Sequence, residues 1–192
     1  MPIPIPYRAS GFTLGDPSAN AKIDVFFDIQ CPHSKRAWPT IIELLKHYES
    51  KPVSVTAHII TLSNHRQAWD LSLALFALAD GDAKRFFDFV GFLFERQEQY
   101  LNEPFKHKTH DDLRQLTADF AEQHAAVDRD QFLDRMSQHD IYIQARTPIR
   151  FAATRSVWAT PTFFINNADD VPVSFDSDLQ QWIEVIDPLL AE

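Results

Sequence analysis

The pattern of apolar and polar positions predicts strands and helices in alternation. Residues 23–29 form a short β-branched and aromatic run, which predicts a buried strand. Residues 37–45 carry apolar side chains at helical spacing, and residues 53–60 alternate before becoming wholly apolar, as a central strand does. Residues 1–20 are rich in Pro, Gly, Ser and Asp, so we expect an extended arm and a turn there.

The middle of the chain is expected to be almost entirely helical. Two apolar-rich helices are predicted at residues 66–80 and 84–96, on either side of an Asp-Gly-Asp turn. Three more helices are predicted to follow, beginning at Thr109, Asp128 and about Ile141. The helical character ends near residue 155.

Strand character returns near the end of the chain. Residues 162–166 predict a strand, and a turn at residues 167–170 is expected to lead into a short partner strand at residues 171–174. The chain then ends in a predicted helix, with Ser177 and Gln180 as a capping box ahead of an apolar stripe.

This order of elements predicts an α/β fold interrupted by a block of helices. Residues 1–62 and 156–192 would form the α/β part, and residues 63–155 the helical insertion. Large aromatic side chains in and around the insertion are expected to pack in the core: Phe86, Phe87, Phe89, Phe92, Phe94, Trp38, Trp69 and Trp158. The alternative for the phenylalanines is the lining of an apolar pocket near the active site, and for Trp158 it is the border of a substrate groove.

Composition and charge narrow the class of protein. Hydrophobic residues make up 45% of the 192 residues, which is typical of a folded chain. With 27 acidic and 18 basic side chains the net charge is −9, which disfavours nucleic acid and anionic membranes as partners. No apolar run approaches the ~18 residues of a membrane span, and the amino terminus lacks the pattern of a secretory signal. We therefore expect a soluble, cytoplasmic protein.

The single cysteine, Cys31, is the strongest candidate for chemistry. It precedes Pro32 at the start of a predicted helix, where free backbone N–H groups and the helix dipole favour a thiolate. His33 adds a donor or a positive charge nearby, and the hydroxyl of Ser34, one turn from the sulfur, is within hydrogen-bonding reach. Each residue also has a simpler interpretation. Cys31 would be a small buried hydrophobic residue, His33 a solvated residue at the helix start, and Ser34 a capping or first-turn residue.

Other motifs carry weaker signals. His107 and His110, followed by Asp111 and Asp112, resemble part of a metal site, but they lack a further ligand and fit a solvated helix start better. Only 4 glycines are present, and no phosphate-binding loop or nucleotide fingerprint is found. The sequence therefore predicts neither a metal site nor nucleotide chemistry.

Two stretches resemble the DsbA-like thioredoxin-fold oxidoreductases. Residues 15–34 end in Cys-Pro-His-Ser, close to the Cys-Pro-His-Cys active site of that family, and residues 157–166 resemble its cis-proline loop and following strand. The resemblance extends over nearly the whole chain and implies a thioredoxin-like fold with an inserted α-helical subdomain. It also implies that Thr160 and Pro161 lie beside Cys31 and bind a peptide or glutathione in strand-like fashion. Pro32, which follows Cys31, is expected to contact the same substrate. An ordinary trans proline opening a strand is the alternative for Pro161.

The departure from the family pattern is Ser34, which stands where a second, resolving cysteine is usual. A hydroxyl cannot attack a mixed disulfide. The resemblance therefore implies a monothiol thiol-disulfide oxidoreductase that forms a Cys31 mixed disulfide with glutathione or a protein and needs an outside thiol for release. No bound cofactor is expected, glutathione being a possible co-substrate, and the oligomeric state is left open.

Two other functions fit the same residues. Kappa-class glutathione transferases have a similar fold with a helical insertion, and they use a hydroxyl residue near this place. A redox-inert protein that keeps the groove to bind peptides would also have lost the resolving cysteine.

Overall fold

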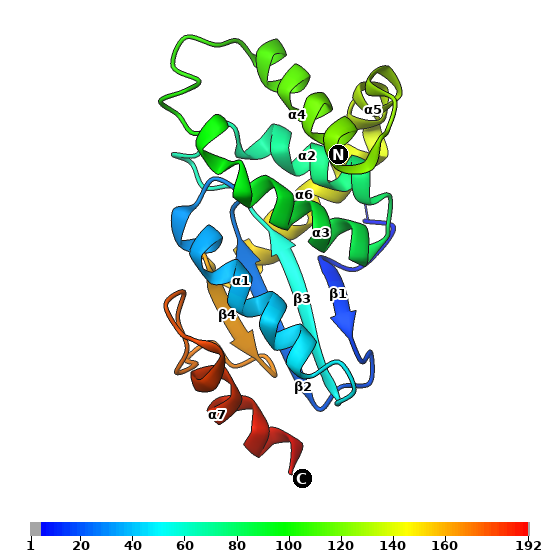
Figure 1. Ribbon diagram of the computed structural model, residues 1–192. Helices are drawn as coiled ribbons and strands as arrows, with labels where there is room; N and C mark the ends of the chain where they lie inside the picture. Colours follow the sequence, from blue (N-terminus) through cyan, green and yellow to red (C-terminus); the bar gives the residue numbers. More distant parts are fainter. Residues whose placement is uncertain (1–4, 192) are drawn as a thin grey trace.

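The computed structural model describes residues 5–191, which form a mixed sheet of four strands covered by helices (Figure 1). The strand order is β1-β3-β2-β4. The two central strands, β2 (Ala21–Phe27) and β3 (Val53–Ile59), are parallel, and the edge strands β1 (Phe12–Gly15) and β4 (Thr162–Ile165) run antiparallel to them. The predicted α/β class is confirmed.

The two faces of the sheet carry separate apolar clusters because side chains alternate along each strand. On β2, Ile23, Val25 and Phe27 belong to the main core, while Phe26 belongs to a smaller cluster that includes Ala152. Ala152 comes from α6 (His139–Thr154), which runs behind the sheet in Figure 1 while α1 runs in front of it.

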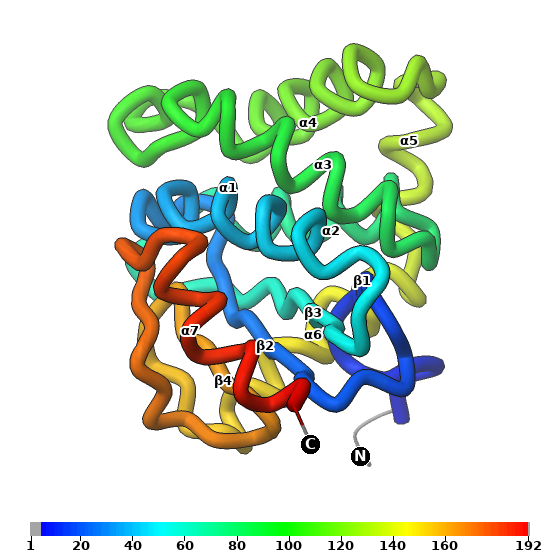
Figure 2. The backbone as a smooth tube through the Cα atoms, turned by 60° about the horizontal axis from the view of Figure 1, so that its bottom comes forward, coloured from blue at the N-terminus to red at the C-terminus, as the bar shows by residue number. Residues whose placement is uncertain are grey.

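Helices α1 (Pro32–His47) and α7 (Leu179–Leu190) lie side by side on the same face, as both views of the backbone show (Figures 1 and 2). Trp182 of α7 is buried against Phe163 of β4, with ring centroids 5.1 Å apart. The apolar stripe predicted for the last helix therefore docks on the sheet.

The helices between β3 and α6 form a second layer above the sheet (Figure 1). The first of them, α2 (Ala68–Ala79), is almost wholly buried, because other helices pack around it. The predicted phenylalanine core is confirmed for Phe86, Phe87, Phe89 and Phe94, and Phe92 packs partly buried against it. Whether residues 63–155 form a unit of their own stays a prediction. The helices of this layer are α2 (Ala68–Ala79), α3 (Ala83–Glu95), η1 (Gln97–Gln99), α4 (His110–Ala125) and α5 (Arg129–Met136).

Strand β1 lies in the segment expected to be only an arm and a turn. It has 4 residues, too few for a clear alternation in the sequence. It ends at Gly15, whose φ is +97° and whose added Cβ would collide with the carbonyl oxygen of Val53. The glycine that suggested a turn thus also permits close strand pairing.

The last loop differs from the sequence prediction in two ways. The partner strand expected at residues 171–174 is wrong: Ile165 pairs instead with Ala168 in an isolated bridge, because Asn166 and Asn167 both adopt positive φ and turn the chain sharply. The predicted capping box of α7 is off by one residue. It consists of Asp178 and Gln181, which exchange two hydrogen bonds of 2.9 Å.

Tyr48 joins the end of α1 to α7. Its side chain is buried, and its hydroxyl donates a 2.7 Å hydrogen bond to Oδ1 of Asp187. Burial, together with the hydrogen bond and charge of Asp187, raises the pKa of the Tyr48 hydroxyl well above its usual value. The hydroxyl therefore stays protonated and donates throughout the neutral range.

We expect Tyr48→Phe to lower the free energy of unfolding by about 1–2 kcal/mol, because it removes a hydrogen bond to a carboxylate and keeps the ring. Urea unfolding followed by tryptophan fluorescence measures the change. Tyr7→Phe, at a tyrosine that is 84% exposed, is the matched control and should leave the midpoint unchanged. Equal midpoints for the two variants would contradict a stabilising Tyr48–Asp187 bond.

Candidate active site

Cys31 lies where the loop after β2 becomes α1. It is the N-cap residue of that helix, with Pro32 in the first turn as the sequence predicted. The Cys31 backbone N–H donates to the carbonyl of Asp28 (3.0 Å), and its carbonyl accepts from Lys35 N (3.1 Å), which begins the helical ladder. The cysteine is therefore held by the backbone on both sides.

The two sequence motifs meet at the sulfur. The Thr160–Pro161 peptide bond is cis, as the resemblance implied, and Cys31 Sγ donates a 3.1 Å hydrogen bond to the carbonyl oxygen of Thr160. Cys31 is only 4% exposed and Thr160 only 7%. Within the described part of the chain, the buried Oγ1 of Thr160 has no hydrogen-bond partner.

The sulfur lies between the start of α1 and the carbonyl of Thr160. The start of α1 offers backbone N–H groups and the positive end of the helix dipole, which favour the thiolate. The carbonyl of Thr160 accepts the thiol proton and would repel a thiolate at the same 3.1 Å distance. A ligand that bonds to the carbonyl of Thr160 must therefore take the place of the Cys31 thiol as donor.

The neighbours of Cys31 in the motif contact other groups. Ser34 is 2% exposed, and its hydroxyl accepts a 3.4 Å hydrogen bond from Asp28 N rather than bonding to the sulfur. The exposed His33 packs its ring on Phe175, with centroids 4.2 Å apart. His33 thus lines the rim of the site beside an aromatic side chain from the last loop.

Asp28 is a functional candidate that the sequence reasoning missed. Its carboxylate is fully buried and accepts hydrogen bonds from the backbone of Gln30 (2.8 Å) and of Leu62 (2.7 Å). The Nδ1 atom of His65 lies 2.9 Å from the same carboxylate, without the direction of a hydrogen bond. An acidic residue at the end of an apolar strand was the available signal. Asp28 ties the Cys31 loop to the segment after β3.

Buried amides from the helical layer also reach the cysteine loop. The Nε2 atom of Gln97, in η1, donates to the carbonyls of Ile29 (2.9 Å) and Cys31 (3.1 Å). The side chain of Gln30 donates a 2.8 Å hydrogen bond to Gln67, the residue before α2. Polar residues far away in the sequence give no local signal of such contacts.

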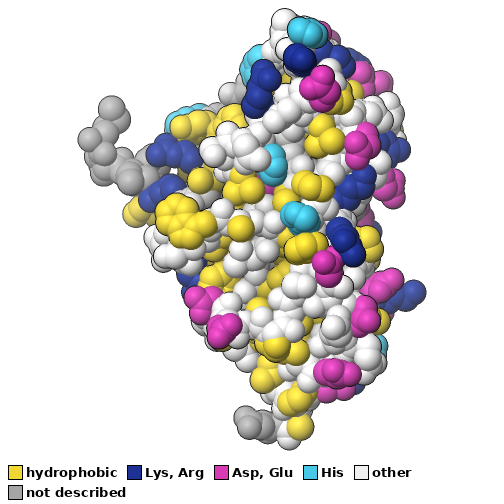
Figure 3. All heavy atoms as spheres, turned by 90° about the vertical axis from the view of Figure 1, so that its left-hand side faces the viewer, with side chains coloured by type: hydrophobic (Ala, Val, Ile, Leu, Met, Phe, Trp, Pro, Cys, Tyr) yellow, Lys and Arg dark blue, Asp and Glu magenta, His cyan; other side chains and the backbone are white. Residues whose placement is uncertain are grey.

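Trp158 differs from its expected packing role. It is 84% exposed, two residues before Thr160, whereas Trp38 is buried and Trp69 partly buried as predicted. Figure 3 shows the side of the molecule that carries the start of α1, and apolar side chains gather there in several patches. The alternative that Trp158 borders a substrate groove therefore fits its position better.

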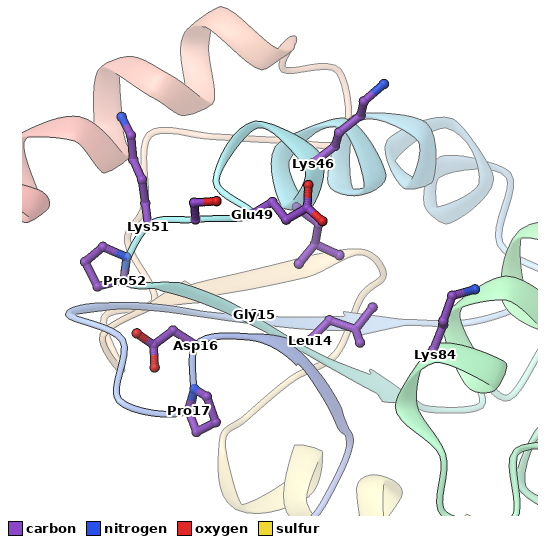
Figure 4. A pocket seen from close by; sticks show the side chains of 11 residues that line it. Leu14, Gly15, Asp16, Pro17, Lys46, Glu49, Lys51, Pro52 and Lys84 are labelled. Atoms are coloured by element: carbon purple, nitrogen blue, oxygen red, sulfur yellow. The ribbon is translucent and has the colours of Figure 1, made fainter.

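A cavity lies far from the sulfur, at the other end of α1 (Figure 4). It measures about 820 Å³ and is lined by Lys46, Lys51 and Lys84, whose ammonium groups point in different directions. Lys84 is already paired with Asp88 at 2.6 Å. The three ammonium groups are therefore not placed to bind the same ligand atom.

At the place of the weak metal signal, the structure has a hydrogen bond between His110 and Asp70. His110 Nε2 lies 2.8 Å from Oδ1 of Asp70, and residues 5–191 contain no cluster of three or more ligand-type side chains able to hold a metal ion. Among these residues no helix is both long and apolar enough to cross a bilayer.

Solved structures with the same architecture are DsbA-like proteins. BdbD from Bacillus subtilis (oxidised) has a TM-score of 0.73 at 20% identity, covering 96% of this chain and 98% of its own. Wolbachia pipientis alpha-DsbA1 scores 0.72 at 17% identity, with 98% and 94% covered. Chlamydia trachomatis DsbA scores 0.69 at 19% identity, with 100% and 99% covered. These likenesses confirm the predicted thioredoxin-like fold with its helical insertion.

Sequence comparison gives the family. Among curated proteins, no match is found. A family model described as thioredoxin matches residues 8–185, which is nearly the whole chain. The chain therefore belongs to the thioredoxin family.

Proposed function

We propose that this protein is a monothiol thiol-disulfide oxidoreductase whose nucleophile is Cys31. The observation that carries the proposal is the 3.1 Å contact between Cys31 Sγ and the carbonyl of Thr160, at the start of a helix and beside a cis-proline. The DsbA-like names of the structural neighbours support the same chemistry.

The reaction consists of two thiol-disulfide exchanges. The Cys31 thiolate attacks one sulfur of a substrate disulfide, which forms a mixed disulfide with Cys31 and releases the other substrate sulfur as a thiolate. An external thiolate, such as that of glutathione, then attacks the mixed disulfide and releases Cys31. Each exchange breaks one sulfur–sulfur bond and forms another. Ser34 cannot perform the second attack, because a hydroxyl does not displace a thiolate from a disulfide at neutral pH.

The proline loop would bind the substrate backbone. Once the sulfur leaves Thr160, the carbonyl of that residue is free to accept a backbone N–H from an extended peptide. The unpartnered Oγ1 of Thr160 offers a further hydrogen-bonding group at the same place. Pro32 and Pro161, which have no N–H, flank the sulfur without competing for these acceptors.

The rim of the site favours a polypeptide as the main substrate. Trp158 is 84% exposed, and His33 packs on Phe175, so the surface beside the sulfur is rich in aromatic groups. A peptide with an apolar residue near its disulfide would bury part of the Trp158 indole, whereas glutathione has no large apolar side chain. We therefore propose a protein disulfide as substrate, with glutathione as the co-substrate that releases it.

Incubation of the folded protein with oxidised glutathione should give one glutathione adduct, located on Cys31 by intact-mass and peptide analysis. Cys31→Ser should give none. An adduct that forms only after denaturation would contradict the proposal and identify Cys31 as a buried packing residue. Glutathione conjugation of an electrophile that survives Cys31→Ala would instead indicate a transferase.

Ser34→Cys should restore a resolving thiol. The hydroxyl of Ser34 is buried one turn from Cys31, so a thiol there is placed to attack a Cys31 mixed disulfide. We expect the glutathione adduct to accumulate on the natural chain and to be replaced by an intrachain disulfide in Ser34→Cys. Ser156→Cys, on a residue of the exposed turn after α6, is the control and should leave the Cys31 adduct in place. A stable adduct in both variants would count against the assigned geometry.

Trp158→Ala should slow the reaction with a peptide disulfide flanked by an aromatic residue about tenfold, because roughly 1.4 kcal/mol of contact with the indole is lost. The reaction with oxidised glutathione should change little. Stopped-flow rates for both substrates give the comparison, and Tyr7→Ala, at a residue with the same 84% exposure, is the control. Equal losses for peptide and glutathione would exclude Trp158 as a selective contact.

A further inference from the structure

Gln97 joins the helical layer to the nucleophile loop through a single side chain. The residue is 2% exposed and lies in η1, directly after α3. Both hydrogens of its Nε2 amide are used, one on the carbonyl of Ile29 at 2.9 Å and one on the carbonyl of Cys31 at 3.1 Å. Because this amide is buried, loss of the two bonds would leave polar groups without partners and would lower the stability of the fold.

These two carbonyls determine the orientation of the peptide groups around Cys31. The Cys31 carbonyl is shared between Gln97 and Lys35 N, which lies 3.1 Å away. The following Pro32 has no N–H, so the Cys31–Pro32 peptide group is held through its oxygen alone. Gln97 therefore supports the extended backbone of Cys31, with φ −73° and ψ 122°, that directs its side chain to the start of α1.

The same contact acts on the electrostatics of the sulfur. A carbonyl oxygen that turned toward Sγ would repel a thiolate, as the carbonyl of Thr160 does at 3.1 Å. Gln97 holds the oxygens of Ile29 and Cys31 on its own amide. The backbone dipoles left to act on the sulfur are then the free N–H groups at the start of α1 and the carbonyl of Thr160.

We propose that Gln97 is a positioning residue for Cys31, through which the helical layer sets the reactivity of the thiol. This inference rests on the proposed role of Cys31 as the nucleophile. It assigns to a residue of η1 a role that a merely structural residue would not have: loss of the amide changes the pH dependence of the Cys31 reaction as well as the stability of the fold.

Gln67 provides a matched control. It is 4% exposed, and its Oε1 accepts a 2.8 Å hydrogen bond from the side chain of Gln30. Gln67→Met thus removes a buried amide in the same region without removing a bond to Cys31. Gln97→Met is similar in volume change and flexibility, and it removes both bonds to the loop.

The test is the rate of Cys31 alkylation by iodoacetamide as a function of pH, for the natural chain and both variants. We expect Gln97→Met to slow alkylation at pH 7 about fivefold and to move its half-maximal rate to higher pH. Gln67→Met should keep the natural profile, and thermal unfolding of both variants shows whether their losses of stability are comparable. Identical profiles for all three folded proteins overturn the role of Gln97, while leaving Cys31 as the nucleophile. A natural chain that reacts only when denatured overturns both proposals.

If Gln97→Met does not fold, Gln97→Glu replaces it. Its volume is nearly that of glutamine, but an ionised carboxylate cannot donate to the two carbonyls. The carboxylate also places a negative charge near the sulfur, so alkylation should slow more at pH 7 than in Gln97→Met. A profile equal to that of the natural chain would again overturn the role of Gln97.

Discussion

The hydrogen bond from Cys31 Sγ to the carbonyl of Thr160 joins two segments that are 129 residues apart. Strand β2 delivers the cysteine and β4 follows the cis-proline, and these two strands are neighbours in the sheet. Because the pairing of β2 with β4 fixes the distance between their ends, the reactive geometry is a property of the sheet. The loops after β2 and before β4 place Cys31 and Thr160 in contact, and the helices on both faces pack against the sheet.

The helical layer contributes more than a cover for the sheet. Three consecutive residues of the Cys31 loop are bonded to it: the carbonyls of Ile29 and Cys31 accept from Gln97, and the side chain of Gln30 donates to Gln67. A loop with so many buried polar groups would be costly without these partners. The insertion and the cysteine loop are therefore coupled, and in the proposed role of Gln97 its two bonds to the loop also orient the backbone that carries the sulfur.

Much of the fold could be predicted, because its signals are local. Residues 23–29 and 53–60 carry strand patterns, and the Cys31-Pro32 and Thr160-Pro161 pairs lie inside recognisable motifs. The exposure of Trp158 is the less favoured of two predictions, since an aromatic residue is usually buried and only its place near the proline loop distinguishes this one. The contacts of Gln97 escaped prediction for another reason. They depend on which loop the sheet brings beside η1, and a single sequence contains no record of that proximity.

Ser34 satisfies the packing and hydrogen bonding of its position in the fold without a second sulfur. In this position the side chain must be small and polar, because it is 2% exposed and its Oγ accepts a hydrogen bond from Asp28 N. A serine hydroxyl meets both requirements, so the buried Asp28 loop is satisfied without a second sulfur. Ser34 supplies no thiol that could attack a Cys31 mixed disulfide. In the proposed mechanism, release of the substrate therefore depends on the concentration of an external thiol.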